Sequence, residues 1–537
     1  MKKLFWLLPL GLFAAVFAGQ AVRLTFGNNI HEAVSLLNIF LGIVNAVALI
    51  WLLARCQLRE LFRLIWRSPI WKWLLLFEAW ALISLILNFG SFTHHQLVVG
   101  FLYWLKLATV LHLAYLVYAY WQEEKATFLR YFLVCSGAII LAGYVQLIFL
   151  PDFSFMTAYG WDPHMGRMLS TFFDPNYLAA FIVLVQTIIL SKALEAQGKV
   201  KFFWWLFFVG AWLALYFTYS RSGWLMGFVA LTAVAFQRSW RTSLVIAAIF
   251  LVVLLFPNRL SGRISEGLSF FNRTTFSQGA TNNTSLNALS GDESAADRAL
   301  SLGRAWSLSK RHWLIGVGYN TYGYAAIKDG LMTGSQQGQM SGMASDSSIL
   351  NIFATTGIIG LGIYLAFYAS LLRISYKLWR RRQLLGGVIF GYALALLVGS
   401  EFNNILFYGL IMACFLVLAA LMKGHADRDE ETQSTSRQQP ADNASPTSIP
   451  SSSVASNIVE QDDHRRLWQN YPLIIISLFV LSLFFSTIKI GFGSLFAYPP
   501  ELLIYLAAVA VLTAPAWRQK FFSRLKQLPK AYKIALG

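Results

Sequence analysis

Two charged residues stand where a membrane protein can act on charged groups. Arg221 lies in TYSRSGW, which interrupts the apolar run 202–237, and Asp346 lies in ASDSSIL, directly before another apolar run. An arginine at such a boundary either reaches lipid phosphates or binds another anion. An aspartate there either caps the helix that follows, which contributes about 1 kcal/mol, or accepts a proton from a reacting group. Neither residue alone decides between its two interpretations.

Three further arginines lie in polar segments between apolar runs. Arg167 precedes the triplet Asp174-Pro175-Asn176 in GRMLSTFFDPNYLAAF, and that triplet is typical of a helix start. Arg298 and Arg304 lie in ADRALSLGRAWSLSKR, where the spacing of apolar residues predicts an amphipathic helix from about 296 to 311. A single basic helix is also typical of a solvated face or of contact with a lipid surface.

The composition indicates that membrane-spanning helices position these residues. Of the 537 residues, 57% are hydrophobic and 13% are charged, and the mean hydropathy is +0.55. This is more apolar surface than a soluble core hides, so an all-α polytopic membrane protein is predicted. The net charge of +18 does not indicate nucleic-acid binding, because excess Lys and Arg usually lie in cytoplasmic loops. The three cysteines lie in or beside apolar segments, so no disulfide framework is expected.

Fourteen apolar stretches are long enough to span a bilayer, and we expect a bundle of about 12 helices with 2 appended C-terminal spans. Their centres lie near residues 13, 45, 80, 109, 140, 185, 210, 230, 250, 360, 393, 413, 480 and 508. Basic clusters follow spans 2, 10 and 14, which predicts that both termini are cytoplasmic. The first stretch, MKKLFWLLPLGLFAAVFAGQA, also resembles a signal peptide, but its Met-Lys-Lys start favours a retained helix.

This topology divides the chain into five parts. The predicted parts are spans 1–9 in residues 1–257, one large external loop in 258–347, spans 10–12 in 348–422, a disordered cytoplasmic linker in 423–468, and two further spans with a basic tail in 469–537. The middle of the external loop is rich in Gly, Ser and Asn, and the linker is polar throughout. The external loop is therefore the one sizeable domain expected outside the membrane.

The order of the motifs resembles the O-antigen ligase and O-antigen polymerase superfamily. That order is RMLSTFFDPNYLAAF, then YSRSGW, then an arginine followed by WLIGVG, and then SDSSILNIFATTGIIGLGIYL. The resemblance covers roughly residues 20 to 422, and its strongest elements are SRSGW and the pair of GVG with SxLNIxxxxGIIG.

The resemblance implies a helical glycosyltransferase of the C type in the bacterial inner membrane, with its active site on the outer face. The implied donor is a glycan on undecaprenyl pyrophosphate, and the acceptor is another glycan or the lipid A-core. Membrane lipid and proteins of polysaccharide export are further implied partners, whereas no nucleic acid is expected.

The resemblance also assigns roles to the arginines. Arg221 and Arg298 match the family's pyrophosphate-binding arginines, Arg304 is a nearby substitute for Arg298, and Arg167 is a third candidate. A guanidinium group binds a departing pyrophosphate in a bidentate manner and keeps its charge. These arginines take the place of a divalent cation, so no metal and no cofactor are expected.

The sequence departs from the ligases of the superfamily at Asp346, where those enzymes usually carry a histidine. A carboxylate can accept the same proton, and inverting sugar transfer commonly uses one as general base. Polymerases of the superfamily vary at this site and often carry an acid, so Asp346 favours polymerisation of O-antigen or exopolysaccharide repeat units over the ligase alternative. We expect Asp346 to cap the following span and also to orient or deprotonate the acceptor hydroxyl.

Two classes of protein outside glycan transfer are alternatives. Fourteen spans also suit a flippase for lipid-linked oligosaccharides, although such carriers generally have two similar halves and short external loops. A scaffold protein is the least favoured class, because the arginines and the acid come from separate segments of the chain.

Overall fold

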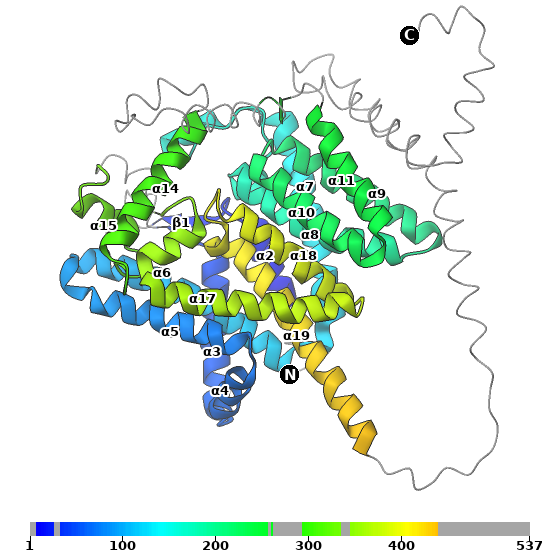
Figure 1. The fold of residues 1–537 in the computed structure, drawn as a ribbon, viewed down its shortest axis with the longest axis horizontal. Coiled ribbons are helices and arrows are strands. Elements are labelled where there is room, and N and C mark those ends of the chain that lie inside the picture. Colours follow the sequence, from blue (N-terminus) through cyan, green and yellow to red (C-terminus); the bar gives the residue numbers. More distant parts are fainter. Residues whose placement is uncertain are drawn as a thin grey trace, which may run out of the picture. The chain divides into compact units, whose positions relative to one another are not determined.

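The structure is a computed structural model in which most of the described residues are helical (Figure 1). The described residues are 7–25, 33–159, 161–255, 259–260, 262, 293–333 and 344–438. Within these ranges, two short strands, β1 (Arg23–Thr25) and β2 (Ala33–Ser35), pair in an antiparallel manner. The prediction of an all-α polytopic membrane protein is confirmed.

Each of the twelve apolar stretches predicted for the bundle contains one helix. These helices are α2 (Leu7–Ala18), α3 (Leu36–Ala54), α5 (Trp71–Leu87), α6 (His94–Tyr120), α7 (Lys125–Phe149), α8 (Pro175–Glu195), α9 (Gly198–Phe217), α10 (Arg221–Arg238), α11 (Trp240–Leu255), α17 (Ser348–Arg380), α18 (Leu384–Gly399) and α19 (Gly409–Gln438). Within the described part of the chain, α3, α6, α7, α8, α9 and α17 are each long and apolar enough to cross a membrane. Predicted spans 13 and 14 lie outside the described residues.

Shorter helices lie in the connecting segments. They are α4 (Leu58–Arg67), α14 (Glu293–Arg311), α15 (Tyr322–Lys328) and the 3-10 turns η1 (Phe89–Ser91), η2 (Gln122–Glu124), η3 (Ser154–Tyr159), η4 (Ser170–Phe172) and η6 (Ile405–Phe407). The chain forms two units, one of residues 1–240 and 262–430 and the other of residues 241–261 and 431–537. All the predicted site residues belong to the first unit.

The last described helix corrects one predicted boundary. The disordered linker is predicted for residues 423–468, but α19 continues from Gly409 to Gln438. No glycine or proline lies between Gly424 and Pro440, so nothing in the local sequence ends the helix earlier. Asp427 also accepts a hydrogen bond from the Tyr118 hydroxyl (2.8 Å) and pairs with Lys423. The rest of the predicted linker lies outside the described residues.

Helix α8 lies at the centre of the packing. Its most apolar stretch is 83% buried, against 17–44% for the other long apolar helices. Helices α9, α10 and α18 pack against it. Gly223 of α10 lies so close to Ala179 that a larger side chain would overlap it, and Tyr392 of α18 donates to the Ala180 carbonyl (3.0 Å). Small residues at such crossings let helix backbones approach closely.

Helix α17 is interrupted at Gly357, whose backbone angles (φ 68°, ψ −172°) are not helical. The interruption frees carbonyl groups in the preceding turn, which need other hydrogen-bond donors. The backbone N–H groups of Val317 and Gly318 donate to the carbonyls of Ala354 and Thr355 at 2.9 and 3.0 Å. The motifs WLIGVG and TTGIIG, distant in sequence, are therefore joined by their backbones.

One face of α5 completes this junction with polar side chains. Trp80 Nε1 donates to the Thr356 carbonyl (2.8 Å), and Ser84 Oγ donates to carbonyls on both sides of the junction (2.9 and 3.0 Å). Asn88 Nδ2 donates to the Gly316 carbonyl (3.1 Å). These three donors are spaced four residues apart, so they share one helical face. The junction fixes the beginning of α17, where Asp346 lies.

We expect Gly357→Ala to destabilise the protein by about 2–3 kcal/mol or more, because a side chain there is strained and overlaps the Leu314 backbone. Gly362→Ala is the matched control, since Gly362 lies in the same helix with open space around its Cα. The control is expected to be neutral or slightly stabilising. Thermal unfolding of the purified variants measures both, and equal melting temperatures for the two would contradict the account of the junction.

Candidate active site at converging helix ends

The segment DPNY begins α8. Asp174 is the cap, and its Oδ1 accepts hydrogen bonds from the backbone N–H groups of Asn176 (2.6 Å) and Tyr177 (3.1 Å). Pro175 occupies the first helical position, where its missing N–H costs nothing. The interpretation of this triplet as a helix start is confirmed, and it places the half-buried Asn176 in the first turn of the helix.

A chain of hydrogen bonds links this helix start to the start of α10 and to the loop after α18. Ser220, the cap of α10, donates through its hydroxyl to Asn176 Oδ1 (2.8 Å). The hydroxyls of Ser220 and Ser222 lie 3.2 Å apart, and Asn403 Nδ2 donates to Ser222 Oγ (2.8 Å). Buried polar networks fix geometry when every member is satisfied. The two serines of SRSGW therefore hold the starts of α8 and α10 and the loop after α18 together.

The cap of α17 is Ser347, and the prediction that Asp346 caps this span is wrong. Ser347 Oγ accepts a hydrogen bond from the Leu350 N–H (3.2 Å) and donates to Glu401 Oε2 (3.1 Å). The capping position requires a side chain that reaches the third helical N–H, and Ser347 stands at that spacing whereas Asp346 is one residue too early. The Asp346 carboxylate is consequently available for another task.

The surroundings of Asp346 come from α14. The backbone N–H of Asp346 donates to Ser301 Oγ of this helix (3.1 Å), and the Asp346 side chain is half-buried. Burial raises the pKa of Asp346 to about 6. The charge of Arg298 and a hydrogen bond from Ser301 oppose this rise, whereas the carboxylates of Asp162 and Asp297 add to it. Such an acid is ionised at neutral pH and basic enough to accept a proton.

A second acid lies within range of two of the predicted arginines. The protein around Asp162 partly desolvates its carboxylate and so raises its pKa, although the side chain keeps exposed surface, and the carboxylates of Asp174 and Asp297 raise this pKa further. The charges of Arg167 and Arg298 act in the opposite direction. The loop after α7 and helix α14 therefore bring arginines and acids into one electrostatic neighbourhood, which also contains Asp346.

Arg167 has a structural bond as well. It is only 9% exposed, and its Nε donates to the Thr218 carbonyl (2.9 Å). The next residue, Met168, donates its N–H to the Phe217 carbonyl (2.9 Å). The loop carrying Arg167 is thereby attached to the turn between α9 and α10, directly before Ser220.

The remaining two arginines, Arg221 and Arg304, lie on two different helices. Arg221 is the first residue of α10, so its position follows from the hydrogen-bonded cap at Ser220. Arg304 lies on α14, where its charge and that of Asp346 both act on the pKa of the Tyr322 hydroxyl. Burial is the largest of these influences and raises the pKa of Tyr322. Arg298 is thus the arginine on α14 that acts on Asp346 itself.

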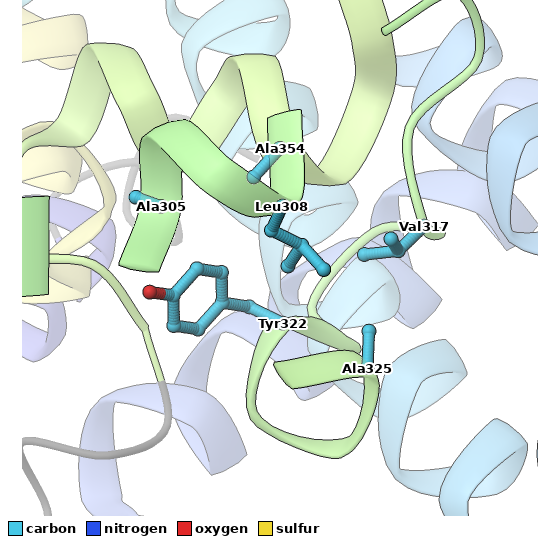
Figure 2. Packing of buried hydrophobic residues seen from close by; sticks show 6 residues of the cluster. All are labelled: Ala305, Leu308, Val317, Tyr322, Ala325 and Ala354. Carbon is cyan, nitrogen blue, oxygen red and sulfur yellow. The ribbon is translucent and has the colours of Figure 1, made fainter. Parts of the chain in front are cut away.

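A small hydrophobic core sets the position of α14. Figure 2 shows Ala305 and Leu308 of α14 gathered with Tyr322 and Ala325 of α15 and with residues of the junction. Ala305 and Leu308 are fully buried. The predicted amphipathic helix is therefore confirmed, and its apolar face packs on protein. Because Arg298 and Ser301 lie on the same helix, this core also positions both residues on the helix that packs against α17, where Ser301 binds the Asp346 backbone.

Three residues of the loop before α8 could hold a metal ion. One ligand atom from each of Asp162, His164 and Asp174 lies within 4.8 Å of the others. The sequence analysis expects no metal, and Asp174 is ten residues or more from the other two along the chain, so their grouping depends on the folded loop. Asp162 is exposed, and two arginines already act on its charge.

Ser301 and Asp162 are site residues that sequence reasoning missed. Ser301 stands three residues after Arg298, one helical turn along a predicted amphipathic helix, and this spacing was a usable signal. Asp162 lies in WDPH, a short polar sequence without a recognisable pattern, and only the folded loop brings it near the arginines.

Fold and site together define a multi-pass helical membrane protein that gathers arginines and acids at the ends of its helices. Residues 206–365 match the family model described as O-Antigen ligase. The match supports the resemblance of the chain to the O-antigen ligase and polymerase superfamily. No curated protein matches the chain.

The matched segment covers most of the candidate site. It runs from α9 through α14 and α15 into α17, and it contains Arg221, Arg298, Arg304 and Asp346, whereas Arg167 lies outside it. The family supports glycan transfer as the general activity, with a lipid-linked glycan and an acceptor as the general substrates.

Proposed function

We propose that this protein transfers a glycan from an undecaprenyl-pyrophosphate-linked donor to a sugar hydroxyl. The observation that carries the proposal is the hydrogen bond from the Asp346 backbone N–H to Ser301 Oγ (3.1 Å), which joins the start of α17 to α14, the helix that carries Arg298. The charge of Arg298 lowers the pKa of Asp346, which burial raises. A cation for the leaving group and a base for the incoming hydroxyl are the two groups that this reaction needs.

The proposed step is a single displacement at the anomeric carbon. The acceptor hydroxyl forms the new glycosidic bond while the bond between the anomeric carbon and the pyrophosphate oxygen breaks. The hydroxyl proton passes to the Asp346 carboxylate, and the pyrophosphate leaves with the electron pair. Arg221 and Arg298 bind its oxygens, with Arg304 and Arg167 as neighbouring candidates, because guanidinium groups stabilise the charge that develops there.

We propose polymerisation of surface polysaccharide repeat units as the outcome. A carboxylate at position 346 supports this choice, since the ligases of the superfamily usually carry a histidine there. Transfer to the lipid A-core is the second candidate, because the matching family model is described as O-Antigen ligase.

The proposed location is the bacterial inner membrane, with the site on its outer face. This orientation rests on the basic clusters that follow predicted spans 2, 10 and 14, which the distribution of positive charge assigns to the cytoplasm. The first of these clusters includes the arginines of α4, at the opposite end of α5 from the junction with α17.

Purified protein incubated with undecaprenyl-pyrophosphate-linked oligosaccharide tests both candidates in one experiment. A ladder of longer lipid-linked chains is the result expected of a polymerase, and label on added lipid A-core would indicate the ligase instead. Absence of both products, together with movement of the intact donor across vesicle membranes, would indicate a flippase.

The same assay in EDTA tests whether a metal takes part. If the arginines alone bind the pyrophosphate, we expect the activity to be unchanged. Activity that is lost in EDTA and restored only by a divalent cation would assign a role to Asp162, His164 and Asp174.

A further inference from the structure

The short helix α4 does not belong to the site, and it does not run along the direction of the spans. Its axis is turned by 109° from that of α5, which follows it after three residues. Ten residues that include three arginines and a glutamate are too short and too charged to cross a bilayer. A helix nearly perpendicular to a spanning helix lies close to the plane of the membrane.

The side chains of α4 divide into three groups around its axis. Ile65 is 4% exposed and anchors the helix to the protein. Phe62 and Trp66 are stacked on one another (5.8 Å between ring centres) and are 55% and 48% exposed. The three arginines follow one another at intervals of four residues, so they form one exposed stripe beside the aromatic pair: Arg59, Arg63 and Arg67.

The charge of this stripe is not balanced by the protein. Within the described part of the chain, none of the three arginines forms an ion pair. Arg55 and Lys72 lie on either side of the helix and add positive charge, against the single acid Glu60. An exposed aromatic pair beside an unbalanced basic stripe matches the boundary between acyl chains and anionic head groups.

We propose that α4 is an interfacial helix that binds anionic phospholipid, with Phe62 and Trp66 among the acyl chains and the arginine stripe on the phosphates. The attraction of one basic residue to an anionic bilayer surface is worth about fivefold in binding. Three arginines therefore give a preference for anionic over zwitterionic lipid on the order of a hundredfold at low salt, which decreases as salt screens the charges.

The lipid retained by the purified protein tests the head-group preference. After exchange into mixed micelles of phosphatidylglycerol and phosphatidylethanolamine, the parent is expected to retain mainly phosphatidylglycerol. Substitution of the three arginines by Gln should reduce the ratio of the two retained lipids at least tenfold, whereas substitution by Lys, which keeps the charge, should preserve it. An unchanged ratio in the Gln variant overturns the proposal, as does loss of the preference in the Lys variant.

The depth of the aromatic pair is tested separately, in case the Gln variant does not fold. A fluorescent label at position 62 can be attached in Phe62→Cys with Cys56→Ser, since the other two cysteines, Cys135 and Cys414, are buried. In vesicles of phosphatidylglycerol, lipid brominated near the head group should quench this label and aqueous iodide should not. Quenching by iodide alone would place the helix in water and overturn the proposal.

Discussion

Asp346→Asn is expected to lower glycan transfer by about a hundredfold to ten-thousandfold, because an amide cannot accept the proton of the incoming hydroxyl. The expected loss is in turnover, measured with purified protein and lipid-linked oligosaccharide. Since Ser347 rather than Asp346 caps α17, this substitution removes no helix cap. Normal activity in the Asn variant would leave the carboxylate without a role in the reaction.

The matched control removes the helix cap and keeps the carboxylate. Ser347→Ala removes the cap and is expected to cost about 1 kcal/mol of stability, while the carboxylate of Asp346 remains. The variant should therefore melt at a lower temperature but retain most of its turnover when assayed well below that temperature. Comparable loss of turnover in both variants would indicate that the start of α17, and not the carboxylate, supports the reaction.

The pH profile gives the same prediction an independent measurement. Burial raises the pKa of Asp346 to about 6, and only the ionised carboxylate accepts a proton. Turnover should therefore be full above about pH 7, fall as the pH decreases through 6, and be about tenfold lower at pH 5. Asp346→His should be partly active, because imidazole also accepts a proton near neutral pH. A profile that is flat between pH 5 and 7 would contradict the assignment.

Much of the fold follows from the sequence because the period and length of apolar runs are local properties. All twelve helices of the predicted bundle are present, and so is the start of α8 at the Asp174 cap. The prediction for Asp346 was wrong by one residue, because Asp and Ser both cap helices well and three candidates stand in a row in DSS. Residue type alone does not show which of these neighbouring residues is the cap. The cap is identified by where the first helical turn begins.

The site was less predictable, because it depends on contacts between distant segments. The sequence indicated Arg298 and Asp346 as candidates. It did not indicate that Ser301, on the same helix as Arg298, accepts a hydrogen bond from the Asp346 backbone. It also marked GVG and TTGIIG as separate motifs. In the fold, the break at Gly357 leaves backbone carbonyls of α17 without helical partners, and the N–H groups of GVG bind them. A helix that is broken in the membrane requires partners elsewhere, and only the fold identifies them.

Arg298→Lys and Arg221→Lys are each expected to lower turnover on the order of a hundredfold, the typical loss for one donor to a developing negative charge. Lysine keeps the charge but loses the two parallel N–H donors of the guanidinium group, so an arginine that only contacted lipid phosphates would tolerate the change. Arg311→Lys is the control on α14. The guanidinium group of Arg311 donates to the Asp329 carbonyl (2.9 Å), and the activity of this variant should stay within about twofold of the parent.

Arg298→Gln then separates pyrophosphate binding from an effect on Asp346. The charge of Arg298 lowers the pKa of Asp346, so its removal should move the acidic limb of the pH profile above 6, whereas Arg298→Lys should leave the limb in place. A shifted limb with unchanged turnover at high pH would mean that Arg298 only adjusts the base. Turnover that stays a hundredfold low at every pH in both variants is expected if its guanidinium group binds the leaving pyrophosphate, because no change in the ionisation of Asp346 can replace the lost pair of donors.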